Sequence, residues 1–431
     1  MLKKLNPVKP LVFCLCYLSG WHVTANGFGL ADQDAFATGR GDAVVATADN
    51  PSAIFYNPAG IAQLTNSNFR GGLNSIFYQP SYQPPAGQPG NGRTFYSSAN
   101  FAYLPQLFYT YTAKGAPLSF GLGVYTPYGG NMSWPNYNWP KDTGFRSVTI
   151  SGSLKYITVN PVIAIHLLPS LSVGGGAMIN YGDISMYQGL KKNAAPLTNF
   201  FNFTGDGWSV GYNAGILWQP HPMISFGATF RSSARLNFQG TTDFEQQPIL
   251  PKAGRTANAE FTFPLTTVCG VSFRPTLKWN LEFDANYTGW NSFGTVTIQQ
   301  QTPVPYPLDK SGKIPVNLDW QGSWMYQFGV TRYFENGWHI SGGYMFNENS
   351  VPDAYYTPLA ADLNRNFFSL GTGFSGKRFD FDIAYQLGCA FKHDVSGSTP
   401  SSTPGQFAGQ TADGRYGFSS QAIIATVGMH F

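Results

Sequence analysis

Alternation of apolar and polar side chains is the feature that most constrains how this chain folds. Between Leu277 and Tyr287 the odd positions carry Leu, Trp, Leu, Phe, Ala and Tyr, and the even positions carry Lys, Asn, Glu, Asp and Asn. Successive side chains of a β-strand point to opposite faces, so this segment would present one apolar and one polar face. Segments 261–273, 324–330 and 379–387 alternate similarly, and we expect the apolar residues of each on one face. An all-β fold is therefore predicted.

The composition excludes three classes of protein. Only 11% of the residues are charged and 16% are aromatic, whereas about 25% of an average soluble domain is charged. A chain so rich in aromatics is not disordered. It also lacks the concentrated positive surface of a nucleic-acid binder, so no nucleic-acid partner is expected. The longest apolar run, 11–18, is too short for a membrane-spanning helix, which needs about 20 residues.

The first 25 residues have the features of a secretory signal peptide. Three lysines precede the apolar run, and residues 23–25 (VTA) offer small side chains at the usual cleavage spacing. We therefore expect residues 1–25 to be removed near Ala25 and Asn26. Their removal takes three of 26 basic residues from a chain with 22 acidic ones, so the mature protein would be close to neutral. Cleavage would also remove two of the four cysteines, and the two that remain do not make a disulfide framework.

Connections of alternating length divide the rest of the chain. Short turns fall near 114–116, 169, 219–222, 275, 335–337 and 375–377, and long polar or Pro/Gly-rich loops fall near 80–95, 128–146, 188–207, 242–257, 301–319, 348–365 and 393–415. They separate 14 predicted strands. An even number of strands, with short turns at one end and long loops at the other, is typical of an outer-membrane barrel.

We therefore predict a 14-stranded antiparallel transmembrane β-barrel formed by residues 67–431, in the outer membrane of a Gram-negative-type bacterium. The barrel must be closed because lipid cannot form hydrogen bonds with the backbone groups of an open sheet edge. The last strand would place Ile423, Ala425, Val427, Met429 and Phe431 on one face. A terminal aromatic in that register resembles the signal read by the barrel-assembly machinery, so this machinery is an expected partner, together with outer-membrane lipid and lipopolysaccharide. The alternative is a soluble β-sandwich.

Residues 26–66 differ from the strands that follow. They are rich in Gly, Ala, Asp and Asn and show little alternation, which predicts turns and short helices. A barrel of about 14 strands is too wide for its own side chains to fill. We expect this segment to plug the periplasmic mouth as an N-terminal hatch and to bury its apolar side chains there. These are Phe28, Leu30, Phe36, Val44, Val45, Ile54 and Phe55.

The polar faces of the strands contain paired carboxylates. Glu282 with Asp284, and Asp380 with Asp382, could form an acid–base site. Polar residues that face the lumen are obligatory in this architecture, however, and we interpret the pairs as a solvated lumen face. None of the six histidines has ligand spacing to another, and no phosphate-binding glycine loop precedes a helix. We expect no metal, no cofactor and no catalytic residue.

Several motifs resemble one family of transporters. Residues 27–30 (GFGL), 37–46 (ATGRGDAVVA) and 49–60 (DNPSAIFYNPAG) resemble the hatch of the long-chain fatty-acid transporter family, FadL and its toluene/xylene-uptake relatives. Residues 118–129 (LSFGLGVYTPYG) look like the third strand of that family, and residues 338–346 (WHISGGYMF) with 351–353 (VPD) look like its eleventh strand and the following loop. The resemblance covers essentially the whole mature chain.

The resemblance implies a route for a hydrophobic ligand. Extracellular loops would capture the ligand, an interior pocket near the hatch would hold it, and a gap at a kinked third strand would release it sideways into the membrane. Pro127 has no N–H for the ladder and Gly129 relaxes the backbone, so this strand end can break its pairing. Asn57, Pro58 and Ala59 would hold the hatch, near this gap.

Two long loops contain aromatic residues that could touch the ligand. Trp134 and Trp139 lie in one loop, and Phe200 and Phe201 lie in the next. They could form an apolar landing groove or simply pack loop on loop. Phe28 and Leu30 of the hatch are further expected ligand contacts.

A fatty-acid carboxylate should also meet a fixed cation. The candidates are Arg40 in the hatch and Arg231 and Arg235, which we expect to face the lumen. Arg40 could instead hold a hatch carboxylate such as Asp42 or Asp49. If none of the three arginines binds the ligand, a neutral hydrocarbon could replace the acid.

The sequence therefore predicts an outer-membrane import channel for hydrophobic small molecules, long-chain fatty acids first, and not an enzyme. Neutral or aromatic hydrocarbons are the alternative substrates. A general diffusion porin, whose hatch would leave the lumen open, is a second interpretation. An outer-membrane hydrolase is a third, because His393 and Asp394 head a long loop.

Overall fold

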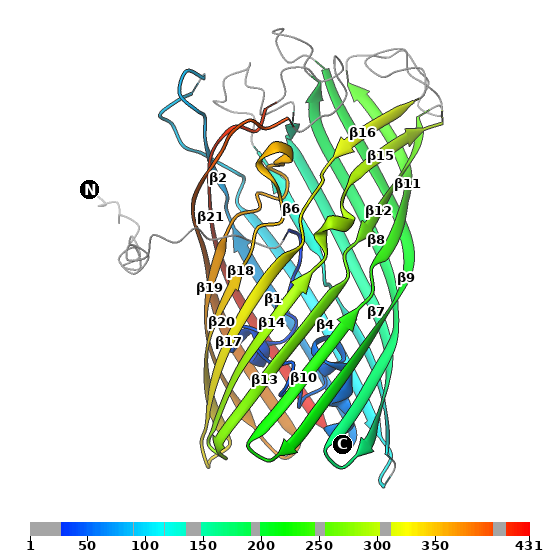
Figure 1. The fold of residues 1–431 in the computed structure, drawn as a ribbon, viewed down its shortest axis with the longest axis vertical. Coiled ribbons are helices and arrows are strands. Elements are labelled where there is room, and N and C mark those ends of the chain that lie inside the picture. Colours follow the sequence, from blue (N-terminus) through cyan, green and yellow to red (C-terminus); the bar gives the residue numbers. More distant parts are fainter. Residues whose placement is uncertain are drawn as a thin grey trace, which may run out of the picture.

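The computed structural model describes residues 27–431 apart from 89, 116, 135–147, 191–198, 246–254, 302–311 and 400–410. It contains a closed antiparallel β-barrel of 14 spans (Figure 1). The barrel closes where β21 pairs with β1, in a register that includes Phe69 opposite Met429. The backbone N–H of Phe431 donates to Ser67 O at 3.0 Å and extends this seam to the end of β21. The predicted fold class and strand number are confirmed.

Seven of the spans are single strands, and the others are interrupted or extended. The single strands are β7 (Ser151–Leu168), β8 (Leu171–Leu190), β9 (Asn199–His221), β18 (Trp338–Asn347), β19 (Arg365–Ser375), β20 (Phe379–Val395) and β21 (Gly414–His430). The first two spans are β1 (Asn66–Tyr78) and β4 (Asn100–Thr112), with β2 (Ser81–Gln83) and β3 (Phe95–Tyr96) as short extensions at the extracellular end. The interrupted spans are β5 (Leu118–Tyr125) with β6 (Gly129–Ser133), β10 (Ile224–Arg231) with β11 (Ala234–Glu245), β12 (Thr256–Phe263) with β13 (Thr266–Thr276), β14 (Trp279–Thr288) with β15 (Thr295–Gln300), and β16 (Lys313–Asn317) with β17 (Ser323–Tyr333).

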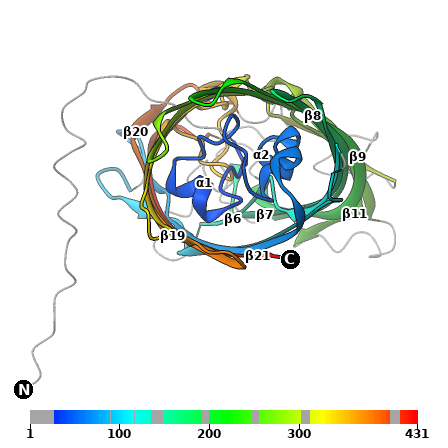
Figure 2. The ribbon, with the colours of Figure 1, turned by 90° about the horizontal axis from the view of Figure 1, so that it is seen from below.

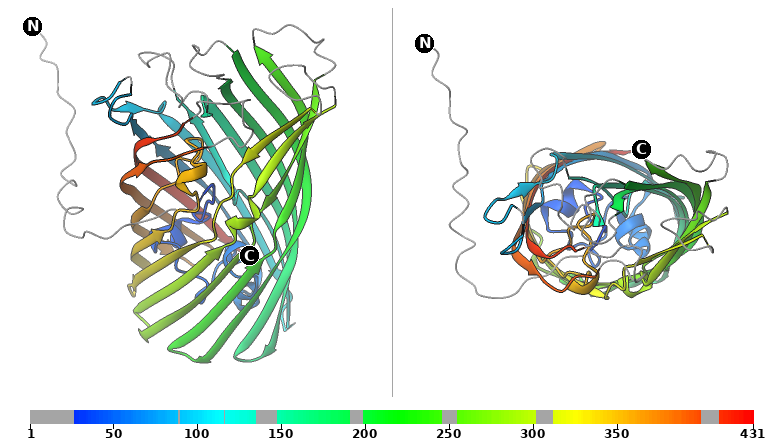
Figure 3. Two further views of the ribbon diagram at one scale, coloured as in Figure 1. Left: turned by 45° about the horizontal axis from the view of Figure 1, so that its top comes forward. Right: turned by 90° about the horizontal axis from the view of Figure 1, so that it is seen from above.

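The hatch lies inside the barrel, near the end with the short turns (Figures 2 and 3). Its short helices are α1 (Ala35–Gly39), α2 (Ala53–Tyr56) and the 3₁₀ helix η2 (Pro58–Gln63). Two further 3₁₀ turns, η4 (Trp290–Ser292) and η5 (Asp353–Tyr355), belong to the barrel connections. Among the described residues, no helix has the length and apolarity needed to cross a membrane.

The alternation that predicted strands is observed directly on β14. Trp279, Leu281 and Phe283 are exposed on the outer wall, while Asn280 and Glu282 between them are buried inside. An apolar outer face is what a lipid environment favours.

The inward face changes between the two strands of several interrupted spans, as β12 and β13 show. On β12, Phe261 and Phe263 point inward and are buried, whereas Val271 and Phe273 on β13 are exposed outside. The expectation that residues 261–273 share one apolar face is therefore wrong. Pro264 and Leu265 belong to neither strand, so inward positions change from odd to even numbers across them. A shift of one residue moves every side chain to the opposite face.

The reversal gives the extracellular half of these spans an apolar interior. Leu236 and Phe238 of β11 are buried inside, together with Phe261 and Phe263 of β12. Arg235 and Glu260 of the same strands lie outside and form an exposed ion pair at 3.4 Å. These two spans are thus apolar outside over β10 and β13 and apolar inside over β11 and β12.

Ion pairs join the hatch to the wall. Arg70 of β1 is buried and donates to Asp34 of the hatch, to Asp380 at 2.9 Å and to Asp382 at 2.7 Å. Asp34 also caps α1 by accepting from the Phe36 N–H at 3.0 Å. One arginine therefore links a hatch helix to β20.

A second set of contacts uses the other carboxylate pair. Glu282 accepts from Arg40 at 3.2 Å and from the Ala46 N–H at 2.7 Å. Asp284 accepts from the N–H groups of Val44 and Val45 at 2.8 and 2.9 Å. The interpretation of Glu282 and Asp284 as a solvated lumen face is wrong, because both are buried against the hatch. Asp382 is likewise buried, in its contact with Arg70.

Loss of the Arg70 contacts should loosen the hatch. The change Arg70→Met leaves three carboxylates near one another without their cation, and breaking buried pairs of this kind costs about 3–5 kcal/mol. We expect a lower unfolding temperature and a measurable ion conductance in planar bilayers. Lys278→Met is the control, since Lys278 pairs with Glu335 on the exposed surface and should change neither property. Unchanged conductance in Arg70→Met would contradict this role of Arg70.

Candidate functional site

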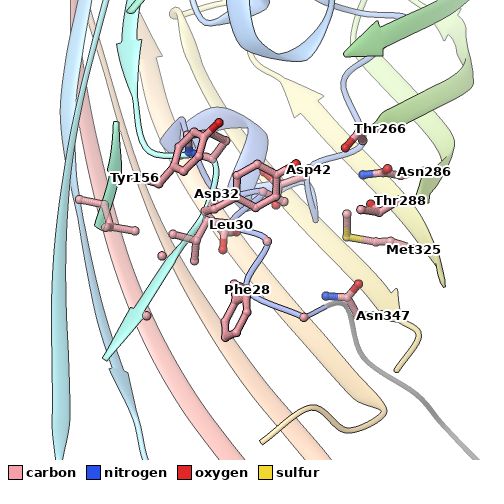
Figure 4. Close-up of a pocket in the computed structure, with 18 of the residues that line it drawn as sticks. Phe28, Leu30, Asp32, Asp42, Tyr156, Thr266, Asn286, Thr288, Met325 and Asn347 are labelled. Atoms are coloured by element: carbon pink, nitrogen blue, oxygen red, sulfur yellow. The ribbon is translucent and has the colours of Figure 1, made fainter. Parts of the chain in front are cut away.

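A cavity of about 210 Å³ lies between the hatch and the wall, and we call it the hatch chamber. Figure 4 shows Leu30, Asp32 and Asp42 of the hatch on one side of it and Asn286 and Met325 of the wall on the other. Its lining therefore combines apolar surface with groups that form hydrogen bonds, as in many small-molecule sites.

A second cavity, of about 110 Å³, lies nearer the extracellular end, and we call it the apolar chamber. Phe201, Phe261, Phe293, Ile314 and Trp320 are among its lining residues. The face reversal on β12 brings Phe261 into this lining. The two chambers adjoin, because Phe28, Gly130, Phe263 and Leu359 line both.

The third span is interrupted where it meets the start of the hatch. The N–H of Leu30 donates to Pro127 O at 2.9 Å, and the N–H of Gly129 donates to Phe28 O at 3.1 Å. Gly29 and Tyr128 form an antiparallel bridge between these bonds. The backbone at Pro127 and Gly129 thus pairs with the hatch instead of with β4.

This change of partner leaves β4 without a neighbour on one side. Its ladder with β5 ends at the pair Leu107–Val124, although β4 continues to Asn100. β6 pairs with β7 over Gly129–Ser133, and within the described chain no ladder joins it to β4. The hatch chamber reaches both sides of this gap, at Leu104 of β4 and at Gly130 of β6.

Arg231 provides a cation in the hatch chamber. It ends β10, its guanidinium lies 3.9 Å from the centre of the Phe55 ring, and it donates to Phe55 O. Its Nε is buried without a hydrogen-bond partner. Within the described part of the chain, no carboxylate lies within ion-pair distance of Arg231. A buried cation in this setting favours an anionic ligand group.

Two carboxyl groups of the hatch face the same chamber. Tyr56 Oη donates to Asp42 Oδ1 at 2.9 Å, and Gln386 Nε2 donates to Asp32 Oδ1 at 2.8 Å. Burial, with the neighbouring charge of Asp32 as a second cause, raises the pKa of the Asp42 carboxyl well above its usual range. A higher pKa favours the neutral form of this carboxyl group.

Comparison with known proteins identifies the family. A family model described as outer membrane protein transport protein (OMPP1/FadL/TodX) matches residues 16–431. The chain belongs to this family. The family resemblance in the sequence is thereby confirmed, as is the outer-membrane location.

Individual relatives of this FadL-family protein are distant in sequence. The long-chain fatty acid transport protein of Escherichia coli O6:H1 is 21% identical over 410 residues, which cover 85% of this chain and 86% of the relative. A putative outer membrane protein of Neisseria meningitidis serogroup B is 23% identical over 416 residues, covering 84% and 86%.

Solved structures show the same fold. The crystal structure of a Pseudomonas aeruginosa FadL homologue matches with a TM-score of 0.80 at 18% identity, over 94% of this chain and 99% of that one. The Pseudomonas putida toluene transporter TodX matches with a TM-score of 0.68 at 14% identity, over 94% of this chain and all of that one. At these identities the likeness establishes the fold.

The three arginines expected to meet a ligand lie in different places in this FadL-family barrel. Arg231 lines the hatch chamber. Arg40 is fully buried in its contact with Glu282 of the wall, rather than with a hatch carboxylate, and does not line either chamber. Arg235 lies outside, so the expectation that it faces the lumen is wrong. Ser232 and Ser233 interrupt the span between β10 and β11, which reverses the face as in β12 and β13.

The expected aromatic contacts are also divided. Phe28 and Leu30 line the hatch chamber, and Phe201 lines the apolar chamber. Trp134 is buried, donates from Nε1 to Pro358 O at 3.3 Å, and lines neither chamber. Trp139 and the side chain of Phe200 lie outside the described residues.

Asn57, Pro58 and Ala59 lie against the wall of the barrel. The Asn57 amide donates to Val45 O of the hatch at 2.8 Å and to Ile216 O of β9 at 3.0 Å. A Cβ at Gly174 of β8 would lie 2.6 Å from Pro58 O, so glycine permits this approach. The motif connects the hatch to β8 and β9, and its expected position near the gap stays a prediction.

Some lining residues were not foreseen from the sequence. Asp32, Asn286, Met325 and Leu359 come from four distant segments that meet only in the folded barrel. The alternation on β14 places Asn286 on the inner face, but nothing local marks it as a cavity residue.

Gly130 is a suitable position for blocking the junction of the two chambers. A Cβ at Gly130 would meet nothing within 4 Å, so a leucine there can be accommodated and would extend into the shared space. We expect Gly130→Leu to fold normally and to reduce uptake of hydrophobic compounds to the level of cells without the protein. Gly342→Leu, on the outer wall, is the matched control and should leave uptake unchanged. Normal uptake by Gly130→Leu would rule out passage through this junction.

Proposed function

We propose that this protein imports hydrophobic small molecules across the outer membrane, with long-chain fatty acids as the first substrate class. The observation that carries the proposal is that two cavities and the gap in the wall follow one another along the inside of the barrel. The apolar chamber adjoins the hatch chamber, and the hatch chamber reaches the gap between β4 and β6. A ligand captured by the extracellular loops would pass through both chambers and leave sideways into the membrane.

No cofactor or catalytic step is required by this proposal. Transfer of apolar surface from water to successive apolar sites is favourable by itself. The protein is therefore proposed to act as a channel and not as an enzyme. The hydrolase interpretation is based on His393 and Asp394. His393 Nε2 lies 2.8 Å from Asp353 Oδ1, and Asp394 pairs with Arg415.

Arg231 supports an acidic ligand over a neutral one. Its guanidinium has an unpartnered Nε and adjoins the chamber that the tail of an amphiphile would enter. Both substrate classes occur among the relatives, as a long-chain fatty acid transport protein and as a toluene transporter. Neutral aromatic hydrocarbons are the second candidate, because aromatic side chains such as Phe261, Phe293 and Trp320 line the apolar chamber.

Substitution of Arg231 separates the two substrate classes. A hydrogen bond to a charged group contributes about 1.5–3 kcal/mol, so Arg231→Met should weaken binding of a long-chain fatty acid by about 10- to 100-fold. Binding of toluene should not change. Arg235→Met removes the same charge from the outer wall and should affect neither ligand. Equal fatty-acid affinity in Arg231→Met and the wild type would remove the argument for a carboxylate site at Arg231.

Conductance separates the import channel from a general porin. The purified protein without residues 1–25 should conduct almost no ions in a planar bilayer if the hatch, which lies inside the barrel, closes the lumen. Removal of residues 27–60 should make the barrel leaky. A steady channel of nanosiemens scale in the wild type would favour the porin. Unchanged ion permeability after the deletion would contradict a sealing role for the hatch.

A further inference from the structure

The gap between β4 and β6 exposes two strand edges, and the β6 edge has its own hydrogen-bond partners. On the β6 side the relevant residue is Asn131. Its N–H donates to the hydroxyl of Tyr78 at 2.7 Å, and the same hydroxyl donates to Asn131 O. One phenol therefore satisfies both backbone groups of Asn131, in the way that a neighbouring strand would.

Tyr78 reaches Asn131 from beyond the missing neighbour. It is the last residue of β1, and β4 lies between β1 and the gap, with Asn100 directly opposite Tyr78. The side chain faces inward and lines the hatch chamber. Its ring therefore lies over the inner face of β4, and its hydroxyl contacts β6.

The β4 edge of the gap contains Pro105, which has no N–H to leave unpaired. An unpaired backbone group is unfavourable in lipid, so a proline suits a strand edge without a neighbour. The Gln106 amide, with its nitrogen turned toward the main chain, donates to Leu104 O at 2.6 Å and to Gly72 O at 2.9 Å, and joins β4 to β1.

The gap has defined ends. Its lower end is the last ladder pair, Leu107–Val124. Near its upper end, the N–H of Ser98 donates to Ser133 O at 2.8 Å. The Tyr78–Asn131 contact lies between these limits and shortens the free part of the β6 edge. On the outer wall, Phe101 and Tyr103 of β4 are exposed beside it.

We propose that Tyr78 is a latch that determines the size of ligand able to leave through this gap. The proposal rests on the proposed import of hydrophobic molecules and adds a residue that limits its final step. With the latch closed, the opening lies below Asn131, between Leu104 and Gly129–Gly130, and suits a linear acyl chain. Without the hydroxyl, the opening extends toward Ser133 and admits bulkier molecules.

The test compares Tyr78→Phe with Tyr82→Phe. Both changes remove one phenol that donates to a backbone carbonyl, but Tyr82 donates to Asp413 O, between β2 and the start of β21. Hydrogen exchange at the Asn131 amide measures the latch directly. Loss of its acceptor should speed that exchange by about tenfold in Tyr78→Phe, with no change in Tyr82→Phe. Equal exchange in Tyr78→Phe and the wild type would overturn the latch.

Uptake of two radiolabelled probes measures its consequence. One probe is a linear long-chain fatty acid, and the other carries a bulky ring at the end of the same chain. The ratio of bulky to linear uptake should rise in Tyr78→Phe and stay at the wild-type value in Tyr82→Phe. A wild-type ratio in Tyr78→Phe, with faster exchange at Asn131, would show that the contact exists but does not limit passage.

The two proposals fail in different ways. If the wild type takes up neither probe, the proposed function is wrong, and the exchange of Asn131 still decides whether Tyr78 holds the β6 edge. If the wild type takes up the linear probe and Tyr78→Phe does not alter the ratio, only the latch is wrong. Assembly of each variant is checked by its heat-dependent mobility in gels.

Discussion

The buried contacts of Arg70 are the interactions on which the rest of the structure depends. Arg70 joins Asp34 at the start of α1 to Asp380 and Asp382 of the wall. With α1 fixed, the segment before it is held beside the third span. There Phe28 and Leu30 take the backbone partners that β4 would otherwise use. The opening between β4 and β6 is therefore a consequence of where the hatch lies.

The interrupted spans solve a second problem, which is the change of surroundings along the barrel axis. At membrane level the outer wall must be apolar and the inside can be polar. Beside the apolar chamber the inner face is apolar instead. Short breaks at Ser232–Ser233 and Pro264–Leu265 exchange the two faces, so that Phe238 and Phe261 point inward while Arg235 and Glu260 point outward. The same sheet thus presents an apolar face to lipid below and to the chamber above.

The polar groups inside the barrel divide into two kinds. Glu282 and Asp382 are paired with the hatch or with the arginine that holds it, and they stabilise its position. Asp284 binds the hatch backbone and also lines the hatch chamber. Arg231 and the Asp32–Asp42 pair border open space and are available to a ligand. This distinction matters because an ion pair satisfied within the protein contributes little to binding, whereas a buried cation without a carboxylate partner attracts an anion strongly.

The sequence by itself determined the barrel and its hatch. Alternation with period two shows which face of a strand is apolar. The lengths of the connections show at which end of the barrel each one lies, so local patterns were enough to predict the 14 strands. Only the tertiary structure decided the faces beyond each break, the partners of Arg40 and Arg70, and the meeting of Tyr78 with Asn131. A break of two residues leaves the local alternation intact but exchanges the inner and outer faces. For this reason the alternation alone predicts the wrong face for Arg235. The chamber and the gap depend on contacts between segments far apart in the chain, and no periodicity records which of those segments meet.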